Sequence, residues 1–161
     1  MQTVATWNDL RQQAAAGLSA SATDDRVNAD RALSFLDTWL TEPLYQPQSD
    51  SILAHIREGK FDLLLDSFHQ LLPFGTGGRR GRVGFGPNRI NQATVEVSVQ
   101  GHCDYLRENA PAAARRVVVA FDTRIFADIA GTYGFLGPDN QLHGLTSRAL
   151  ARTACEMPAH D

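Results

Sequence analysis

The segment from Phe74 to Asn91 reads FGTGGRRGRVGFGPNRIN and combines closely spaced glycines with four arginines. Glycine permits tight turns and lets a backbone approach a ligand closely. Successive backbone N–H groups in such turns can converge on an anion, and an arginine guanidinium can donate two parallel hydrogen bonds to a phosphate. The segment therefore predicts a binding site for a phosphorylated ligand.

The standard nucleotide-binding motifs do not account for this segment. A P-loop needs a GK[ST] ending, and a dinucleotide fingerprint needs a preceding strand and a GxGxxG register, neither of which the segment has. From the residues alone, the alternative is a glycine-rich surface turn whose arginines are solvated.

Composition sets limits on the partners of the chain. The 161 residues are 43% hydrophobic and 20% charged, as in a soluble globular domain. A net charge of −3 argues against nucleic acid or an anionic membrane as a general partner. The start MQTVATWNDLRQQ lacks the basic and apolar blocks of a signal peptide, and no apolar run approaches the roughly 20 residues of a membrane span. We expect a cytoplasmic protein with Cys103 and Cys155 as free thiols.

Helical periodicity dominates the chain before the segment. The start is weakly helical, and the residues that follow have the composition of a mobile connection. Leucines at helical spacing, and then proline and glycine stops, mark the next elements. We predict a helix over Trp7–Ala16, a mobile connection over Gly17–Asp25, a helix from Asn28 that Glu42 and Pro43 end, a loop over Pro43–Gln48, a helix over Ser49–Gly59 and an amphipathic helix over Phe61–Leu72.

The pattern directly after Asn91 is mixed. Val95, Val97 and Val99 alternate as in a strand, whereas Val95, Val99 and Cys103 fit one helical face. Periodicity alone leaves both alternatives open.

A second candidate site follows further along the chain. Arg116–Phe121 (RVVVAF) is a continuous apolar run typical of a strand buried on both faces, and Asp122–Arg124 form a polar turn at its carboxyl end. A helix is predicted over Phe126–Tyr133, and another from about Gln141 to Glu156. A strand, polar turn and helix place ligand groups in the crevice of an open α/β sheet.

The order of residues in FGTGGRRGRVGFGPNRIN resembles the opening motif of the α-D-phosphohexomutases, which include phosphoglucomutases and phosphomannomutases and carry a pattern close to FGTxGxRG. VVVAFDTR, from Val117 to Arg124, is similar to the strand and turn that follow in this family. Trp39 and the stretch Gly59-Lys60-Phe61 are similar to the lead-in of its larger phosphoglucomutase and phosphopentomutase branch. The resemblance covers roughly residues 35–157.

The resemblance implies an α/β fold with two parts. Residues 1–72 would form a helical N-terminal extension, and residues 73–161 an incomplete α/β/α phosphohexomutase domain I. It also implies a helix, and not a strand, over Asn91–Glu108. The strand at Val117–Phe121 would keep an unpaired edge, which predicts self-association.

The resemblance also assigns candidate site residues. Thr76 and Arg80 match the loop beside the family's catalytic phosphoserine, and Arg80 would hold phosphate charge in the cleft. Gly78 and Gly81 belong to the same phosphate-cleft loop.

Two features modify this assignment. Arg79 stands where the family has an apolar residue, and Gly77 where alanine or serine is common, so the loop is more basic and more flexible. Asp122 and Arg124 match the polar turn of the family, although an internal ion pair and helix cap is an equally good interpretation.

The family moves a phosphoryl group between positions of a sugar phosphate through a phosphoserine, with Mg²⁺ beside the serine. Its ASHNP-like serine loop, DxDxDR-like metal loop, GEMSG-like sugar loop and C-terminal phosphate loop have no counterpart in this sequence. We expect the N-terminal part of an isomerase of carbohydrate metabolism, an intramolecular phosphotransferase, whose partner is a phosphosugar. No residue here is expected to act as the nucleophile or to bind Mg²⁺, so this chain alone would be inactive.

The rival hypothesis is a noncatalytic module. It would use Arg79, Arg80, Arg82 and Arg89 to hold a phosphate, a phosphosugar or an RNA backbone.

Overall fold

The computed structural model describes residues 6–22, 26–76 and 78–157. The chain divides into two units, Met1–Ile90 and Asn91–Asp161, and each is described by itself. The predicted boundary between residues 72 and 73 stays a prediction.

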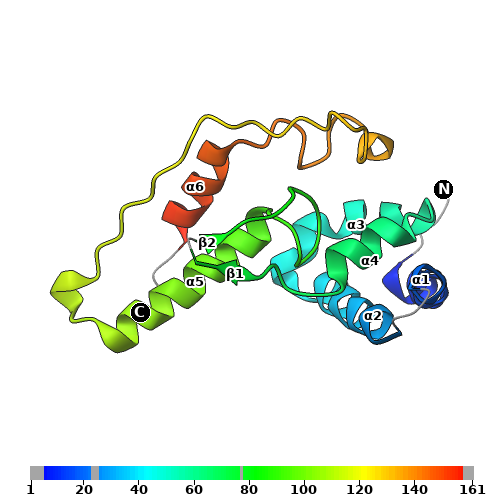
Figure 1. Cartoon of the computed structure of the whole chain (residues 1–161), viewed down its shortest axis with the longest axis horizontal. Helices are drawn as coiled ribbons and strands as arrows, with labels where there is room; N and C mark the ends of the chain where they lie inside the picture. The colour runs from blue at the N-terminus through cyan, green and yellow to red at the C-terminus, as the bar shows by residue number, and fades with distance from the viewer. Residues whose placement is uncertain (1–5, 23–25, 77, 158–161) are drawn as a thin grey trace. The chain divides into compact units, whose positions relative to one another are not determined.

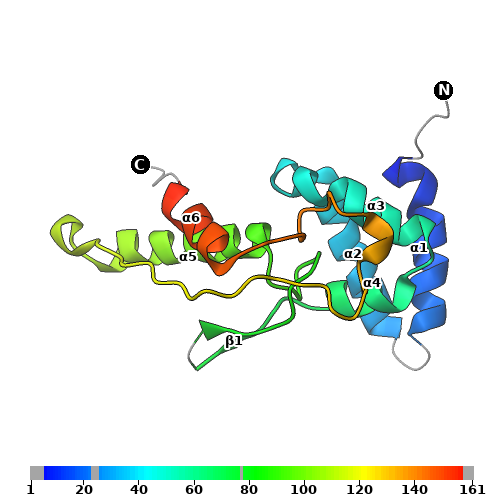
Figure 2. The same cartoon turned by 90° about the horizontal axis from the view of Figure 1, so that it is seen from above.

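The described part of the first unit is mainly helical, as predicted for the N-terminal region (Figures 1 and 2). Short connections let its amphipathic helices pack their apolar faces on one another. The largest fully buried side chains come from every α-helix of the unit: Leu18, Leu36, Ile52, Ile56, Leu64 and Phe68. The elements are α1 (Trp7–Ser21), α2 (Arg26–Thr41), the 3-10 helix η1 (Pro43–Gln48), α3 (Ser49–Arg57), α4 (Phe61–Phe68) and the strands β1 (Phe74–Gly75) and β2 (Gly78–Arg79).

Helix α1 is longer than predicted. It continues through Gly17 to Ser21, so the predicted mobile connection was wrong for residues 17–21. Leu18 is fully buried and extends the apolar face of the helix by one turn beyond Ala14. A Cβ on Gly17 would lie 2.3 Å from the Phe61 ring, so glycine is what permits this close approach of α1 and α4. Residues 23–25 of the predicted connection lie outside the described residues.

Two other predicted elements differ in detail. Pro43–Gln48 is a 3-10 helix and not an irregular loop; Pro43 at its start fits because its missing N–H would have no partner there. Helix α4 ends at Phe68, short of Leu72.

The second unit contains α5 (Gln92–Asn109), the 3-10 helices η2 (Ala112–Ala114) and η3 (Gly134–Leu136), and α6 (Ser147–Glu156). The predicted helix after Asn91 is confirmed. Asn91 caps it reciprocally: its Oδ1 accepts from the backbone N–H of Thr94 at 3.0 Å, and the Thr94 hydroxyl accepts from the Asn91 N–H at 3.1 Å. This cap explains why helix prevails over the alternating valines.

The predicted strand at Arg116–Phe121 was wrong. Among the described residues no strand pairs with this segment, and its side chains are exposed, Val118 by 94%. A strand requires a neighbour for its backbone hydrogen bonds, which local sequence cannot supply.

The predicted helix over Phe126–Tyr133 was also wrong. The Asp128 carboxylate accepts from the backbone N–H groups of Thr132 and Tyr133 at 2.9 and 2.6 Å, and this forms a turn in place of a helix. Helix α6 begins six residues later than the predicted Gln141, at Ser147, where the Thr146 hydroxyl accepts from the Ala149 N–H at 3.0 Å.

Candidate phosphate-binding segment

The glycine and arginine segment begins with a short antiparallel pair in the first unit. Phe74 of β1 pairs with Arg79 of β2, and Gly75 with Gly78, so Thr76 lies at the tip of the hairpin. Gly78 has φ +105°, a left-handed conformation that favours glycine. The Arg79 guanidinium carbon lies 5.9 Å from the centroid of the Phe74 ring, within range of a cation–π contact.

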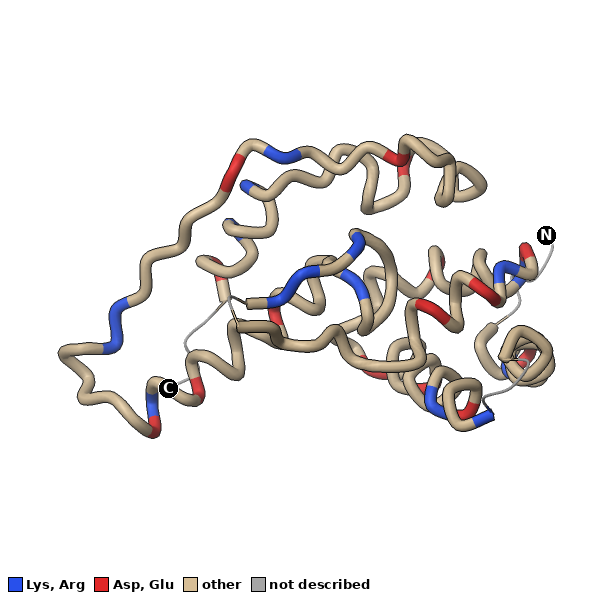
Figure 3. The backbone as a smooth tube through the Cα atoms, viewed as in Figure 1, with Lys and Arg blue, Asp and Glu red and all other residues tan. Residues whose placement is uncertain are grey.

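The predicted phosphate-cleft residues lie on the exposed part of this segment. Thr76, Arg80 and Gly81 are exposed, and Gly78 is half-buried. Arg82 follows, with 84% of its side chain exposed and its Nη1 3.7 Å from Asp66 Oδ2. Figure 3 shows the basic residues of this segment following one another along the tube. Gly77 lies outside the described residues.

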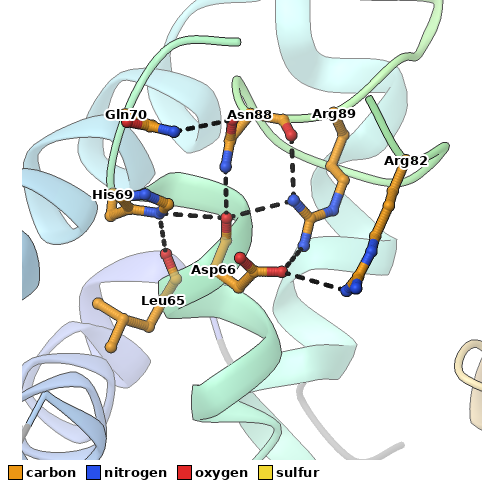
Figure 4. A network of polar contacts seen from close by, with 7 residues as sticks. All are labelled: Leu65, Asp66, His69, Gln70, Arg82, Asn88 and Arg89. Atoms are coloured by element: carbon orange, nitrogen blue, oxygen red, sulfur yellow. Dashed lines mark hydrogen bonds and ion pairs between the residues drawn. The ribbon is translucent and has the colours of Figure 1, made fainter. Parts of the chain in front are cut away.

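The later half of the segment is buried and holds Arg89 against α4. Arg89 is 3% exposed, and its guanidinium pairs with the Asp66 carboxylate (Figure 4). It also donates to the backbone oxygens of Asp66 at 3.2 Å and Asn88 at 3.0 Å. Arg89 is thus an internal anchor, so the anion-binding hypothesis keeps only Arg79, Arg80 and Arg82.

Backbone and amide hydrogen bonds complete this attachment. The Asn88 N–H donates to Ser67 O at 3.0 Å, and its side-chain amide donates to Asp66 O at 2.9 Å. The Leu72 N–H donates to Pro87 O at 2.9 Å. The two bonds from Asn88 satisfy carbonyl groups at the C-terminal end of α4, which lack partners within the helix, and the bond from Leu72 ties the chain that leaves α4 to the segment.

An aromatic contact packs Phe85, in the middle of the segment, against His55 of α3. The buried Phe85 ring meets the His55 ring edge to face, with centroids 5.7 Å apart. Burial lowers the pKa of His55, partly opposed by the hydrogen bond that its Nδ1 makes with Ser51 O at 2.6 Å. A neutral imidazole therefore packs against Phe85 at neutral pH.

Sequence reasoning did not find Asp66 or His55. Both lie on helices of the predicted extension, far in sequence from the segment they contact. A polar residue on an amphipathic helix is ordinary, so the pattern carried no signal that could distinguish Asp66 from its solvated neighbours.

The second candidate site, in the other unit, is an ion pair. Arg124 Nε donates to Asp122 Oδ2 at 2.6 Å, and the Arg124 N–H donates to Asp122 Oδ1 at 3.1 Å. The Ser147 hydroxyl donates to Asp122 Oδ1 at 2.7 Å, and this bond is the largest of the causes that lower the Asp122 pKa. Asp122 thus ties the turn to the first residue of α6, which matches the structural interpretation of this pair.

Within the described ranges, no three His, Cys, Asp or Glu side chains gather as metal ligands. That no residue of this chain binds Mg²⁺ stays a prediction. A bilayer could not be spanned by any described helix, since none is both long and apolar enough.

Comparison with known families confirms the resemblance over part of the chain. Residues 72–133 match the family model described as phosphoglucomutase/phosphomannomutase, alpha/beta/alpha domain I. This match contains the exposed arginines, the buried anchor and Asp122, and it supports the predicted α/β class.

Curated relatives give the same family. The phosphoglucomutase of Staphylococcus aureus (strain USA300) is 35% identical over 77 residues, which are 47% of this chain and 14% of that protein. The phosphopentomutase of Mus musculus is 34% identical over 87 residues, 53% of this chain and 14% of that protein. The chain thus covers only a small part of these relatives. No solved structure matches significantly.

Proposed function

We propose, from the similarity of residues 72–133 to domain I of the phosphoglucomutase/phosphomannomutase family, that this chain contributes the phosphate-cleft loop of an isomerase that moves a phosphoryl group within a sugar phosphate. One observation carries the proposal: the family match falls on a segment whose exposed part presents Thr76, Arg80 and Arg82. Guanidinium groups in this setting would hold the charge of a bound phosphate.

The segment has a buried half that holds it in place and an exposed half that can contact a ligand. Its buried half is tied to α4 through Arg89 and Asn88, which lowers the entropic cost of presenting the exposed half to a ligand. The chain supplies binding groups and no candidate nucleophile, so we propose that it has no mutase turnover by itself. Phosphosugar as the ligand, Mg²⁺ in the whole enzyme and a cytoplasmic location belong to the same proposal.

A noncatalytic phosphate-binding or RNA-binding module is the second candidate. It is favoured by the exposure of Arg80 and Arg82, which any anion could reach. The two candidates differ in salt dependence, because binding through charge alone weakens steeply as salt rises.

Calorimetric titration of the full chain with glucose 1-phosphate, and with single-stranded RNA, tests the proposal. We expect the sugar phosphate to bind in moderate salt. Arg80→Gln should weaken this binding roughly ten- to a hundredfold, since a charge-assisted hydrogen bond contributes about 1.5–3 kcal/mol. Arg31→Gln, which changes an exposed arginine of α2 by the same charge, is the control and should bind as the parent does. Equal losses in both variants, or binding of RNA alone, would refute the phosphosugar proposal.

A further inference from the structure

The segment Val117–Phe121 exposes apolar side chains and an unpaired backbone. It runs as an extended trace between η2 and the turns that follow (Figure 1). Val117, Val118, Val119 and Phe121 are all exposed, although they are large and apolar. Among the described residues, no backbone hydrogen bond joins Val117–Phe121 to another part of the chain. Such a segment can form a β-ladder with another strand.

Its composition favours strand pairing. Valine and phenylalanine have high β-propensity, and neither proline nor glycine interrupts the run. Short segments with these properties are typical of strands that associate between chains.

The charged residues that flank the segment, Arg116 and Asp122, favour pairing with a second copy of this chain in one register. An antiparallel pairing of two copies centred on Val119 places Arg116 opposite Asp122 at both ends. Val117 then lies opposite Phe121, and Val119 opposite its own copy. Opposite charges and apolar pairs that face each other directly across two strands stabilise a ladder.

The side-chain hydrogen bonds of Arg116 and Asp122 within one copy leave both able to pair in this register. Arg116 makes no side-chain hydrogen bond or ion pair among the described residues, whereas Arg115 is engaged with the backbone oxygens of Ala110 and Arg107, both at 2.9 Å. Asp122 accepts three hydrogen bonds, from the Arg124 N–H, Arg124 Nε and the Ser147 hydroxyl. A carboxylate has about four acceptor positions, so one remains for an arginine of a second copy.

Two alternative arrangements place like charges opposite each other and are less favourable. A parallel in-register pair would place Arg116 against Arg116 and Asp122 against Asp122, and like charges directly opposite destabilise a ladder. An antiparallel pair shifted to centre on Ala120 would oppose Arg116 with Arg124.

We propose that Arg116–Asp122 is a self-association strand, through which two copies of this chain pair antiparallel around Val119. The ladder satisfies the backbone groups along one edge of each strand and brings the exposed valines into contact with the side chains opposite them. A two-stranded ladder alone is weak, so the dimer forms reversibly with rising concentration. This inference is independent of the proposed phosphate site.

Sedimentation velocity of the full chain over a wide range of concentration and salt tests the dimer. We expect the mass to rise from 17.6 kDa toward that of two copies. Arg116→Asp and Asp122→Arg should each weaken association about tenfold or more, because two attractive pairs become repulsive in the symmetric dimer. The double variant R116D/D122R restores opposite charges in the same register and should recover dimerisation.

Arg148→Asp is the matched control, since it makes the same charge change at an exposed residue of α6 and should leave association unchanged. Circular dichroism confirms that each variant folds. The proposal would be overturned by a chain that stays monomeric at all concentrations. It would also be overturned if R116D dimerised as strongly as the parent, or if the double variant dimerised no more strongly than the single variants.

Discussion

Gly86, a glycine of the glycine and arginine segment, is needed for packing against α4 and not for contact with a ligand. Its φ of +107° lies in the left-handed region. A Cβ added there would lie 2.7 Å from the backbone oxygen of Ser67 and 2.8 Å from the Phe68 ring. The glycine therefore permits the segment to lie directly on the end of α4.

Replacement of Gly86 by alanine should destabilise the first unit by about 2–6 kcal/mol, because backbone strain and overpacking each cost about 1–3 kcal/mol. Urea unfolding followed by tryptophan fluorescence measures this, since Trp7 and Trp39 are both buried in this unit. Gly59→Ala is the control: Gly59 has φ +65°, but its added Cβ would meet only the Phe61 ring, at 3.8 Å. It should cost about 1 kcal/mol. Equal losses in the two variants would show that the contact with Ser67 and Phe68 is unimportant.

Among the secondary-structure elements, helix α4 holds the glycine and arginine segment in place through Asp66 and the carbonyl groups at its C-terminal end. Asp66 pairs with the buried Arg89 on one side and approaches the exposed Arg82 on the other (Figure 4). The sequence predicted α4 from its apolar face, and it predicted the basic segment from composition. It could not predict that one carboxylate joins them, because contacts between a helix and a loop depend on tertiary packing.

Asp66→Asn should destabilise the first unit by about 1–3 kcal/mol, since it removes the charge that balances the buried Arg89 guanidinium. Asp62→Asn is the control on the same helix, where the carboxylate is exposed, and it should change the free energy of unfolding by less than about 0.5 kcal/mol. Both are measured by urea unfolding. An Asp66→Asn variant as stable as Asp62→Asn would mean that the pair does not anchor the segment.

The two units of the whole molecule differ in how far sequence could predict them. In the first, helices were predictable because their apolar periodicity coincides with a shared core of residues such as Leu36 and Ile56. In the second, periodicity left both helix and strand open for α5, and only the family resemblance predicted a helix there. RVVVAF was assigned to a buried strand, which needs partners elsewhere in the chain. Thr76 and Arg80 were predicted as site residues by family resemblance, and their role in binding stays a prediction.

Hydrogen exchange of the full chain should therefore differ sharply along its length. Amides in the middle of α2 and α4, which are hydrogen-bonded within helices over a buried core, should be strongly protected. At low concentration, amides of Val117–Phe121 should exchange at nearly the rate of an unstructured peptide, because their backbone groups have no partner among the described residues. At high concentration, pairing around Val119 should slow exchange at alternate amides of Val117–Phe121, those that point to the partner strand. The amides of Thr132 and Tyr133, which donate to Asp128, should stay unchanged. Protection of Val117–Phe121 that is already present at low concentration would instead mean that the segment is paired within one chain.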